Sequence, residues 1–402
     1  MTISDGRHVM RAILLLTTLF LLNGCAVLDE GKNFLTGMMG GEDNSNPPTA
    51  LIEYKPEIEL EKIWQESVGD GAGEYYLKLG LAISYGKLFA GDRGGLVVAR
   101  DLKTGDEIWS QDTDKLLSAG PGVGEETVIM GSSHAEVIAL SIETGEPLWE
   151  TQVSSEVLAA PVVSDGIVII RTIDGKVFAL SEKDGKQLWE FERDVPALSI
   201  RGLSRPLVVE GNVIAGFANG KMLALRLTDG KLMWESTIAI PTGRSEVDRL
   251  IDLDADPVEA DGVVFVSSFL AGTFGVLEVD GDVLWKNADV SSKAGMSADW
   301  RYLYVSDKDS EVWQLDQRNG ASLWKQDALQ YRKLSAPAVY DDYVVVGDFA
   351  GYVHWLSASD GRQLARIHLS DAAIDAQPLV VDKTVYVLAR DGALAAYRVK
   401  GK

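Results

Sequence analysis

The chain has 402 residues and is strongly acidic: 60 Asp and Glu residues outnumber 38 Lys and Arg residues, and the formal net charge is −22. Such a surface disfavours nucleic acids and anionic lipid headgroups as direct partners, and it favours solubility and basic protein partners. Length alone predicts two or three domains, but an internal repeat predicts a single closed domain instead.

Residues 1–24 have the pattern of an export signal. Arg7 and Arg11 supply a positive start, and the apolar run from Ala12 to Leu22 is too short to span a bilayer. The run leads into Leu22-Asn23-Gly24-Cys25, which resembles the lipobox of bacterial lipoproteins, where the cysteine is lipidated and becomes the first residue. Cys25 is the only cysteine, so no internal disulfide can form. We expect residues 1–24 to be a lipoprotein signal peptide; the alternative is a plain signal peptide with an incidental cysteine.

Residues 25–56 are predicted to be the lipidated cysteine and a flexible tether, because glycines and the Pro47-Pro48 pair interrupt any regular element. Ala26, rather than aspartate, follows the cysteine, which resembles the pattern of lipoproteins sorted to the outer membrane. The expected location is the periplasmic face of the outer membrane, with lipid as the only membrane attachment.

The rest of the chain repeats a motif in which tryptophan follows glycine by four residues. The period is about 40 to 50 residues, which is typical of repeat architectures. We interpret the tryptophans as packing residues between repeats, with stacking on a ligand as the alternative. The seven copies, the last with alanine in place of tryptophan, are Gly105/Trp109, Gly145/Trp149, Gly185/Trp189, Gly230/Trp234, Gly281/Trp285, Gly320/Trp324 and Gly361/Ala365.

The copy from Ala160 to Trp189 indicates what one repeat forms. Asp-Gly pairs, which favour tight hairpins, separate its short apolar runs. The β-branched run from Ile167 to Ile170 suits a strand that is covered on both faces. Each repeat therefore predicts a four-stranded antiparallel sheet with two apolar faces, and radial stacking of such sheets gives a β-propeller.

Eight repeats are expected between residues 57 and 402. The eighth, from Gln377 to Val399, ends before its fourth strand, whereas the run from Ile58 to Trp64 has no partner strand nearby in the sequence. We predict an all-β, eight-bladed propeller of four-stranded antiparallel blades, whose last blade is completed by the N-terminal strand; this closes the ring and removes exposed edges. The blades are predicted to open near Leu77, Ala119, Ala159, Ser204, Asp256, Ala294, Ala336 and Ala376.

Two insertions, Phe191–Gly202 and Thr237–Asp256, follow the fourth strands of their blades. Insertions in repeat proteins map to loops on one face, which is often the binding face. Apolar residues with an arginine on one loop and carboxylates on the other fit an interface with an apolar anchor and a polar rim. A pair of solvated loops is the alternative. The candidate residues are Leu198, Ile200 and Arg201 on the first loop and Asp252 and Asp254 on the second.

The sequence contains none of the common catalytic motifs considered below. The four histidines lack metal-ligand spacing, and neither a nucleophile elbow nor a Walker A loop occurs. Asp252-x-Asp254-x-Asp256 offers oxygen ligands for Ca²⁺, but it lacks the glycine and the distal glutamate of an EF-hand loop. We predict no catalytic residue, no cofactor and no metal site.

The pattern Asp-Gly-x-Val-x-Ala-Leu, followed by Thr/Asp-Gly-x-x-x-Trp, resembles the quinoprotein-type (PQQ-like) propeller repeat over about residues 58–399. That resemblance allows a quinone-dependent dehydrogenase or a non-enzymatic propeller. Such enzymes carry a vicinal cysteine pair, or other residues that face the cofactor, together with a calcium site. This chain has a single cysteine and is short for those enzymes, so the interpretation as a non-enzymatic propeller is favoured over that as a dehydrogenase.

The chain is more similar to the BamB family, the lipoprotein subunits of the outer-membrane β-barrel assembly machinery. The lipobox, the tether, the eight repeats and the phrases Ala197–Gly202 and Gly243–Leu250 carry this resemblance. It implies that the five candidate loop residues bind the POTRA domains of BamA within the Bam complex. Ile200 stands where leucine is also seen, a change that nearly conserves volume. Unfolded outer-membrane proteins are a further possible partner, through β-augmentation. The alternatives are a quinoprotein-like dehydrogenase and a periplasmic glycan-binding propeller.

Overall fold

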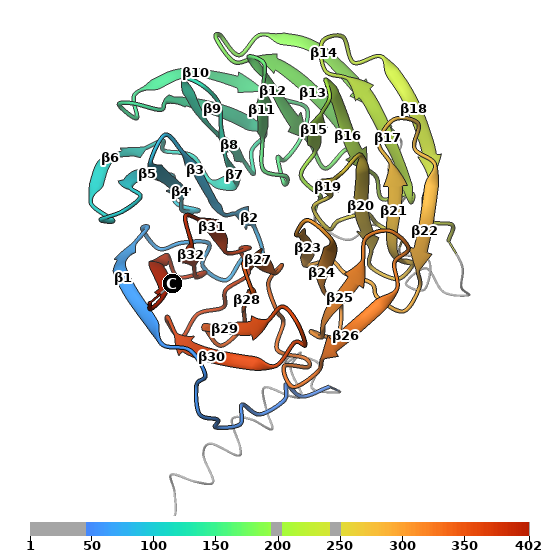
Figure 1. The fold of residues 1–402 in the computed structure, drawn as a ribbon. Coiled ribbons are helices and arrows are strands. Elements are labelled where there is room, and N and C mark those ends of the chain that lie inside the picture. The colour runs from blue at the N-terminus through green and yellow to red at the C-terminus, as the bar shows by residue number, and fades with distance from the viewer. Residues whose placement is uncertain (1–45, 194–202, 242–250, 402) are drawn as a thin grey trace, which may run out of the picture. The chain divides into compact units, whose positions relative to one another are not determined.

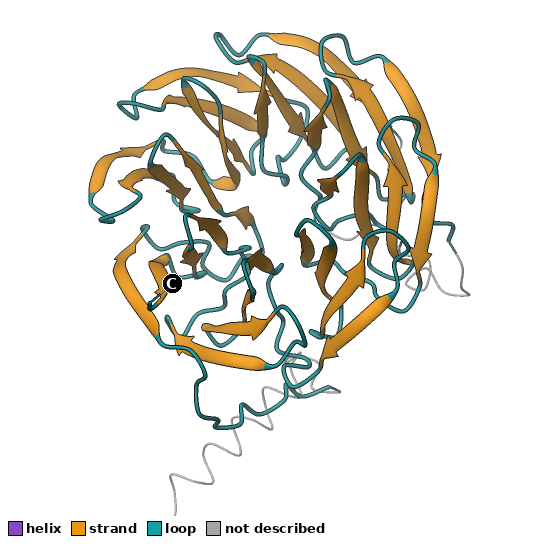
Figure 2. Ribbon diagram, in the orientation of Figure 1, coloured by secondary structure: helices purple, strands orange, loops and turns teal. Residues whose placement is uncertain are grey.

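The computed structural model describes residues 46–193, 203–241 and 251–401, and every regular element within these ranges is a β-strand. The strands form eight sheets arranged radially (Figure 1), and no helix is present among them (Figure 2). This confirms the predicted eight-bladed propeller, which belongs to the unit from Pro48 to Lys402. In the part of the chain that is described, no helix is long and apolar enough to cross a membrane. The predicted signal peptide and Cys25 lie outside the described residues.

Each blade is an antiparallel meander whose strands run in order from the centre of the ring to its rim. Blade 1 comprises β3 (Leu81–Ser84), β4 (Lys87–Gly91), β5 (Leu96–Asp101) and β6 (Glu107–Asp112). Blade 2 comprises β7 (Leu117–Val123), β8 (Thr127–Ser132), β9 (Glu136–Ser141) and β10 (Pro147–Gln152). Blade 3 comprises β11 (Val162–Ser164), β12 (Ile167–Arg171), β13 (Lys176–Ser181) and β14 (Gln187–Glu192). Blade 4 comprises β15 (Leu207–Val209), β16 (Asn212–Gly216), β17 (Lys221–Arg226) and β18 (Leu232–Thr237).

The second half of the ring repeats this order. Blade 5 comprises β19 (Val258–Ala260), β20 (Val263–Ser268), β21 (Gly272–Leu277) and β22 (Val283–Asn287). Blade 6 comprises β23 (Gly295–Ala298), β24 (Tyr302–Ser306), β25 (Val312–Asp316) and β26 (Ser322–Gln326). Blade 7 comprises β27 (Ala338–Tyr340), β28 (Tyr343–Gly347), β29 (Tyr352–Ser357) and β30 (Gln363–His368). Blade 8 comprises β31 (Leu379–Val381), β32 (Thr384–Leu388), β33 (Ala393–Val399) and β1 (Leu60–Ser67).

The ring closes through β1, as predicted. It pairs antiparallel with β33, from Leu60 opposite Val399 to Ser67 opposite Ala393. Figure 1 shows this blue N-terminal strand at the outer edge of the red C-terminal blade. The strand begins two residues later than Ile58 and extends three residues beyond Trp64. Both ends of the propeller therefore belong to one sheet.

The hydrophobic core is divided into eight clusters, one at each interface between neighbouring blades. The cluster between blades 1 and 2, for example, joins Phe89 of β4 to Val128 of β8. This arrangement explains why the second and third strands are apolar on both faces: each sheet is buried by two neighbours. A blade removed from the ring would expose two such clusters to water.

The repeated tryptophans lie at these interfaces, which supports the packing interpretation. In seven blades the indole N–H donates a hydrogen bond to a backbone carbonyl of the next blade, and the indole covers the glycine of that blade's motif. At Gly185, where φ is +67°, an added Cβ would lie 2.5 Å from the ring of Trp149, so the position requires glycine. The hydrogen bonds are Trp64–Leu102, Trp109–Ile142, Trp149–Glu182, Trp189–Leu227, Trp234–Glu278, Trp285–Gln317 and Trp324–Ala358.

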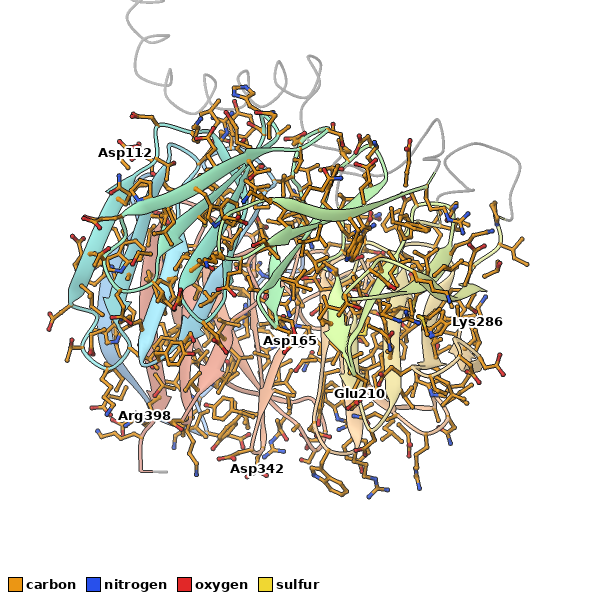
Figure 3. All side chains as sticks on the ribbon, turned by 90° about the horizontal axis from the view of Figure 1, so that it is seen from above. Asp112, Asp165, Glu210, Lys286, Asp342 and Arg398 are labelled. Carbon is orange, nitrogen blue, oxygen red and sulfur yellow. The ribbon has the colours of Figure 1, made fainter. Side chains whose placement is uncertain are left out.

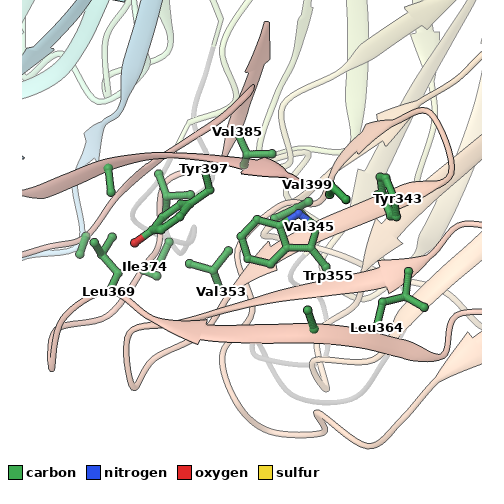
Figure 4. Packing of buried hydrophobic residues seen from close by; sticks show 14 residues of the cluster. Tyr343, Val345, Val353, Trp355, Leu364, Leu369, Ile374, Val385, Tyr397 and Val399 are labelled. Atoms are coloured by element: carbon green, nitrogen blue, oxygen red, sulfur yellow. The ribbon is translucent and has the colours of Figure 1, made fainter. Parts of the chain in front are cut away.

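Blade 7 explains the motif copy that has no tryptophan. In five other blades, an alanine on the third strand pairs with the tryptophan on the fourth, as Ala179 does with Trp189. In blade 7 the two residue types are exchanged, so that Trp355 on β29 pairs with Ala365 on β30. Trp355 is fully buried and meets Tyr397 of blade 8 edge-on, with ring centroids 6.0 Å apart (Figure 4). The indole is therefore kept at this interface, one strand further in.

The structure differs from the expectation at the end of the predicted tether, because residues 48–57 lie against the propeller. The backbone N–H of Thr49 donates to the carbonyl of Gln330 at 3.0 Å, and that of Glu57 donates to the carbonyl of Leu364 at 2.8 Å. Leu51 packs on the cluster between blades 6 and 7. Composition indicated a spacer here, but these backbone pairings are set by a distant turn and a distant strand and leave no signal in the local sequence.

Candidate partner-binding site

The five predicted site residues fall into two groups. Leu198, Ile200 and Arg201 lie outside the described residues, so their placement stays a prediction. Asp252 and Asp254 are described, on the segment that leads into β19. Their side chains are buried, with 1% and 8% of their surface exposed, although the sequence analysis expected them on the rim of an exposed loop.

The burial follows from the apolar residues that alternate with the two aspartates. Ile251 and Leu253 belong to the hydrophobic cluster between blades 4 and 5. Leu253 presses closely on the backbone of β16, where a Cβ added to Gly216 would lie 2.6 Å from the Leu253 Cβ. The segment is thus anchored in the core on both sides of Asp252, and this holds the two carboxylates in place at the base of the second insertion.

Three cationic residues from distant parts of the chain surround this segment. The Lys78 Nζ lies 3.5 Å from Asp256 Oδ1, and the backbone N–H of Arg205 donates to the same oxygen at 2.8 Å. Arg171, at the end of β12, is buried and donates hydrogen bonds to the carbonyls of Ser204 (2.7 Å) and Gly216 (2.6 Å). The site is therefore a cluster of alternating charges rather than an acidic patch.

Lys78 is held there by a short strand that the repeat pattern did not predict. β2 (Lys78–Leu79) pairs in parallel with β7 of blade 2, with Lys78 opposite Ala119. It helps to line a cavity of about 340 Å³ at the centre of the ring, which Arg205, Asp256 and Asp375 also line. The charges at the base of the second insertion therefore continue into the central channel.

Burial controls the charge of Asp254. It raises the pKa of this carboxyl to about 7, and the negative charge of Asp252 acts in the same direction, whereas Lys78 and Arg171 oppose the shift. Burial also lowers the pKa of Arg171 to about 10, against the effects of Asp254 and Asp256. One oxygen of Asp254 makes no hydrogen bond among the described residues. The pKa of this buried carboxyl is therefore raised into the neutral range.

We expect Asp254→Asn to change the pH dependence of stability. The folded-state pKa lies above the unfolded value, so the wild type loses stability as pH rises from about 4 to about 7. A shift of that size corresponds to at most about 4 kcal/mol. Asparagine cannot ionise. In urea unfolding, the free energy of unfolding of Asp254→Asn should therefore rise relative to that of the wild type as the pH increases from 5 to 8. The exposed Asp165→Asn is the control, and equal pH dependence in all three proteins would contradict the assignment.

The candidate calcium ligands Asp252, Asp254 and Asp256 lie among cationic side chains in the described part of the chain. Across residues 46–193, 203–241 and 251–401, no group of three or more His, Cys, Asp or Glu side chains is placed to hold a metal ion. Asp256 instead faces Lys78, and Asp254 lies near Arg171, so cations of the protein occupy the surroundings that a metal would need.

Sequence reasoning missed Lys78, Arg171 and Arg205. Lys78 lies in the short β2, Arg171 ends β12, and Arg205 lies just before β15, so no common motif connects them. One signal was available for Arg171, because it ends the run Ile167–Ile170 inside a predicted buried strand. A charge at such a place needs a buried partner, but the sequence did not indicate which one.

The fold and this site define an eight-bladed propeller of PQQ-like repeats with a charged cluster at the base of an inserted loop. The chain belongs to the BamB family: the family model described as "Outer membrane protein assembly factor BamB" matches residues 93–326 and 315–401. The protein of that name from Pseudomonas aeruginosa is 44% identical over 367 residues, which cover 90% of this chain and 96% of that protein. The one from Escherichia coli is 34% identical over 398 residues, covering 96% and 98%. The resemblance found in the sequence is thus confirmed.

Solved structures share the fold. The crystal structure of BamB from Moraxella catarrhalis has a TM-score of 0.77 and 24% identity, and the match covers 85% of this chain and all of that one. Quinohemoprotein alcohol dehydrogenase from Comamonas testosteroni has a TM-score of 0.66 and 13% identity, covering 88% and 79%. At these identities the likeness concerns the fold alone.

Proposed function

We propose that this protein is a non-enzymatic, lipid-anchored scaffold of outer-membrane β-barrel assembly, and that it binds the POTRA domains of BamA. Membership of the BamB family carries the proposal, because the relatives are named outer membrane protein assembly factors. The docking surface comprises the two insertions, with Leu198, Ile200 and Arg201 as direct contacts.

Asp252 and Asp254 have a supporting role in this proposal. Since both are buried, they act as the charged base that positions the flanking loop, and an approaching cation of the partner would favour the ionised form of Asp254. Lys78 and Asp256 line the central cavity and form an ion pair there. This pair supports the proposal that the charged residues of the cavity stabilise the fold.

The anchor in this proposal is a lipid on Cys25, which would hold the propeller at the periplasmic face of the outer membrane. The lipobox-like sequence before Cys25 and the alanine after it support this location. Cys25→Ser should move the protein from the membrane fraction to the soluble fraction, and unchanged fractionation would remove the anchor from the proposal.

We expect the purified protein to bind the isolated POTRA region of BamA in a titration followed by calorimetry. Arg201→Ala removes a proposed contact and should weaken binding by about tenfold or more. Asp254→Asn keeps the side-chain volume but removes the charge, and it should weaken binding by a smaller factor that vanishes at low pH, where the wild-type carboxyl is also neutral.

Asp165→Asn is the matched control, because it removes a charge from an exposed hairpin of another blade. It should leave the affinity unchanged. Absence of wild-type binding, or equal binding by Arg201→Ala and the control, would overturn the proposal.

A further inference from the structure

One tryptophan of this protein has no part in the packing of the blades. The chain has ten tryptophans, all within the described residues, and nine are buried or half-buried. Trp300 is 80% exposed, and it lies outside the Gly-x-x-x-Trp motif, on the turn between β23 and β24. Exposed tryptophan is costly to keep in water and is enriched among the residues that dominate protein–protein binding energy.

The turn that carries Trp300 is held by an unusual number of hydrogen bonds. The Asp299 carboxylate accepts from the backbone N–H groups of Arg301 (2.7 Å) and Tyr302 (2.6 Å), and from the hydroxyl of Tyr304 (2.9 Å). The Gln317 amide donates to the carbonyls of Asp299 (2.8 Å) and Tyr302 (2.9 Å) from the neighbouring β25–β26 turn. Trp300 is thus presented on a rigid support, which lowers the entropy cost of binding a partner.

Trp300 borders a hollow of about 580 Å³ between blades 5 and 6. Apolar side chains of β20 form part of its wall, so the hollow can receive an apolar side chain of a partner. Its lining consists of Ala260, Asp261, Val263, Phe265, Trp300, Arg301, Gln317 and Arg318.

The guanidinium groups of Arg301 and Arg318 line this hollow. Arg301 lies over the rings of Trp300 and Tyr302, at 5.9 and 5.0 Å from their centroids. Arg318 is bound by Asp316 through two hydrogen bonds of 3.0 and 2.6 Å, and 72% of its side chain is exposed. Both cations therefore lie at the surface, and Arg318 is held by Asp316. Asp261 also lines the hollow and Asp316 pairs with Arg318, so the donors that remain for a partner's carboxylate are those of Arg301 and the N–H groups of Arg318 that Asp316 does not use.

The hollow lies on the face of the ring opposite to the candidate partner-binding site. The β23–β24 turn joins the first two strands of its blade, as do the turns that carry Asp165, Glu210 and Asp342 in other blades. Figure 3 shows those three residues toward one face and Asp112, at the end of a fourth strand, at the other. The segment with Asp254 follows β18, which is also a fourth strand.

We propose that the Trp300 hollow is a second docking site, which binds a segment of a partner protein that carries a carboxylate next to an aromatic or large aliphatic side chain. The apolar side chain enters the hollow against Trp300, and the carboxylate binds Arg301 and Arg318. This inference concerns a separate surface and does not depend on the POTRA proposal.

The test selects a displayed library of random dodecapeptides on the purified protein, after depletion on Trp300→Ala. Enriched peptides are expected to combine Asp or Glu with Phe, Tyr, Trp or Leu. A synthetic copy of the strongest should lose about tenfold or more in affinity with Trp300→Ala and several-fold with Arg301→Gln. Its affinity should be unchanged with Asp254→Asn, which separates this site from the one on the opposite face.

Since Trp300 is exposed, Trp300→Ala should unfold at the wild-type temperature, so a lost signal reports binding rather than folding. Three outcomes overturn the proposal: no peptide distinguishes the wild type from Trp300→Ala, the enriched peptides lack a carboxylate, or they are basic. In a parallel arm, a tetrasaccharide of N-acetylglucosamine is titrated against the tryptophan fluorescence. A Trp300-dependent change there, without peptide enrichment, would reassign the hollow to glycans.

Discussion

A chain that begins at residue 68 should fail to form the closed ring, because it lacks β1. Its loss would leave β33 without its outer neighbour, and it would remove Trp64, which belongs to the cluster between blades 8 and 1. The exposed strand edge and the open cluster are both aggregation hazards. We expect no cooperative unfolding transition by circular dichroism and a large aggregated fraction by size-exclusion chromatography.

Two longer chains serve as controls for this deletion. A chain that begins at Pro48 keeps the whole described propeller and should unfold like the wild type. A chain that begins at Ile58 loses the contacts of residues 48–57 but keeps β1, and it should be destabilised while still forming a monomeric ring. A soluble, cooperatively folded chain from residue 68 would contradict the role given to β1.

Trp189→Ala should strongly destabilise the propeller. The indole is 8% exposed, packs on Gly230 of the next blade and donates a hydrogen bond of 2.8 Å to the carbonyl of Leu227. Replacing it leaves a cavity and an unpaired carbonyl at the interface, at a cost of about 3 to 5 kcal/mol. Urea unfolding at fixed pH measures the difference.

Trp300→Ala is the matched control, since it is the same substitution at an exposed site. It should change the free energy of unfolding by less than about 0.5 kcal/mol. A similar loss of unfolding free energy in Trp189→Ala and Trp300→Ala would contradict the stabilising role given to the tryptophans between the blades.

The repeat made most of the fold predictable. Seven phased glycines and six tryptophans determine the strand order of a blade, and the unfinished eighth repeat indicated how the ring closes. The exchange of Trp355 with Ala365 was not predicted, because it depends on a cross-strand pair that only the register reveals. Residues 48–56 were predicted as tether for a similar reason, since the groups they contact lie on and between blades 6 and 7.

The site was predictable only in part. The interruptions of the period located both insertions, but the burial of Asp252 and Asp254 depends on how Leu253 packs against Gly216. The cations around them come from β2, the end of β12 and the segment before β15, and only the folded blades bring these parts of the chain together. Trp300 could have been singled out from the sequence, because it does not follow a glycine by four residues as the six motif tryptophans do.

The pairing of β1 with β33 also constrains the order in which this protein can fold. A chain that is synthesised, or threaded through a translocase, from its N-terminus delivers β1 first and its partner strand last. Leu60 can therefore pair only after Val399 has been delivered, and blades 1 to 7 can stack before this last pairing closes the ring. Such a distant contact slows folding and leaves strand edges open in the meantime. A chaperone that binds unfolded chains would be needed most before β33 pairs with β1. A chain truncated before β33 could not close its ring.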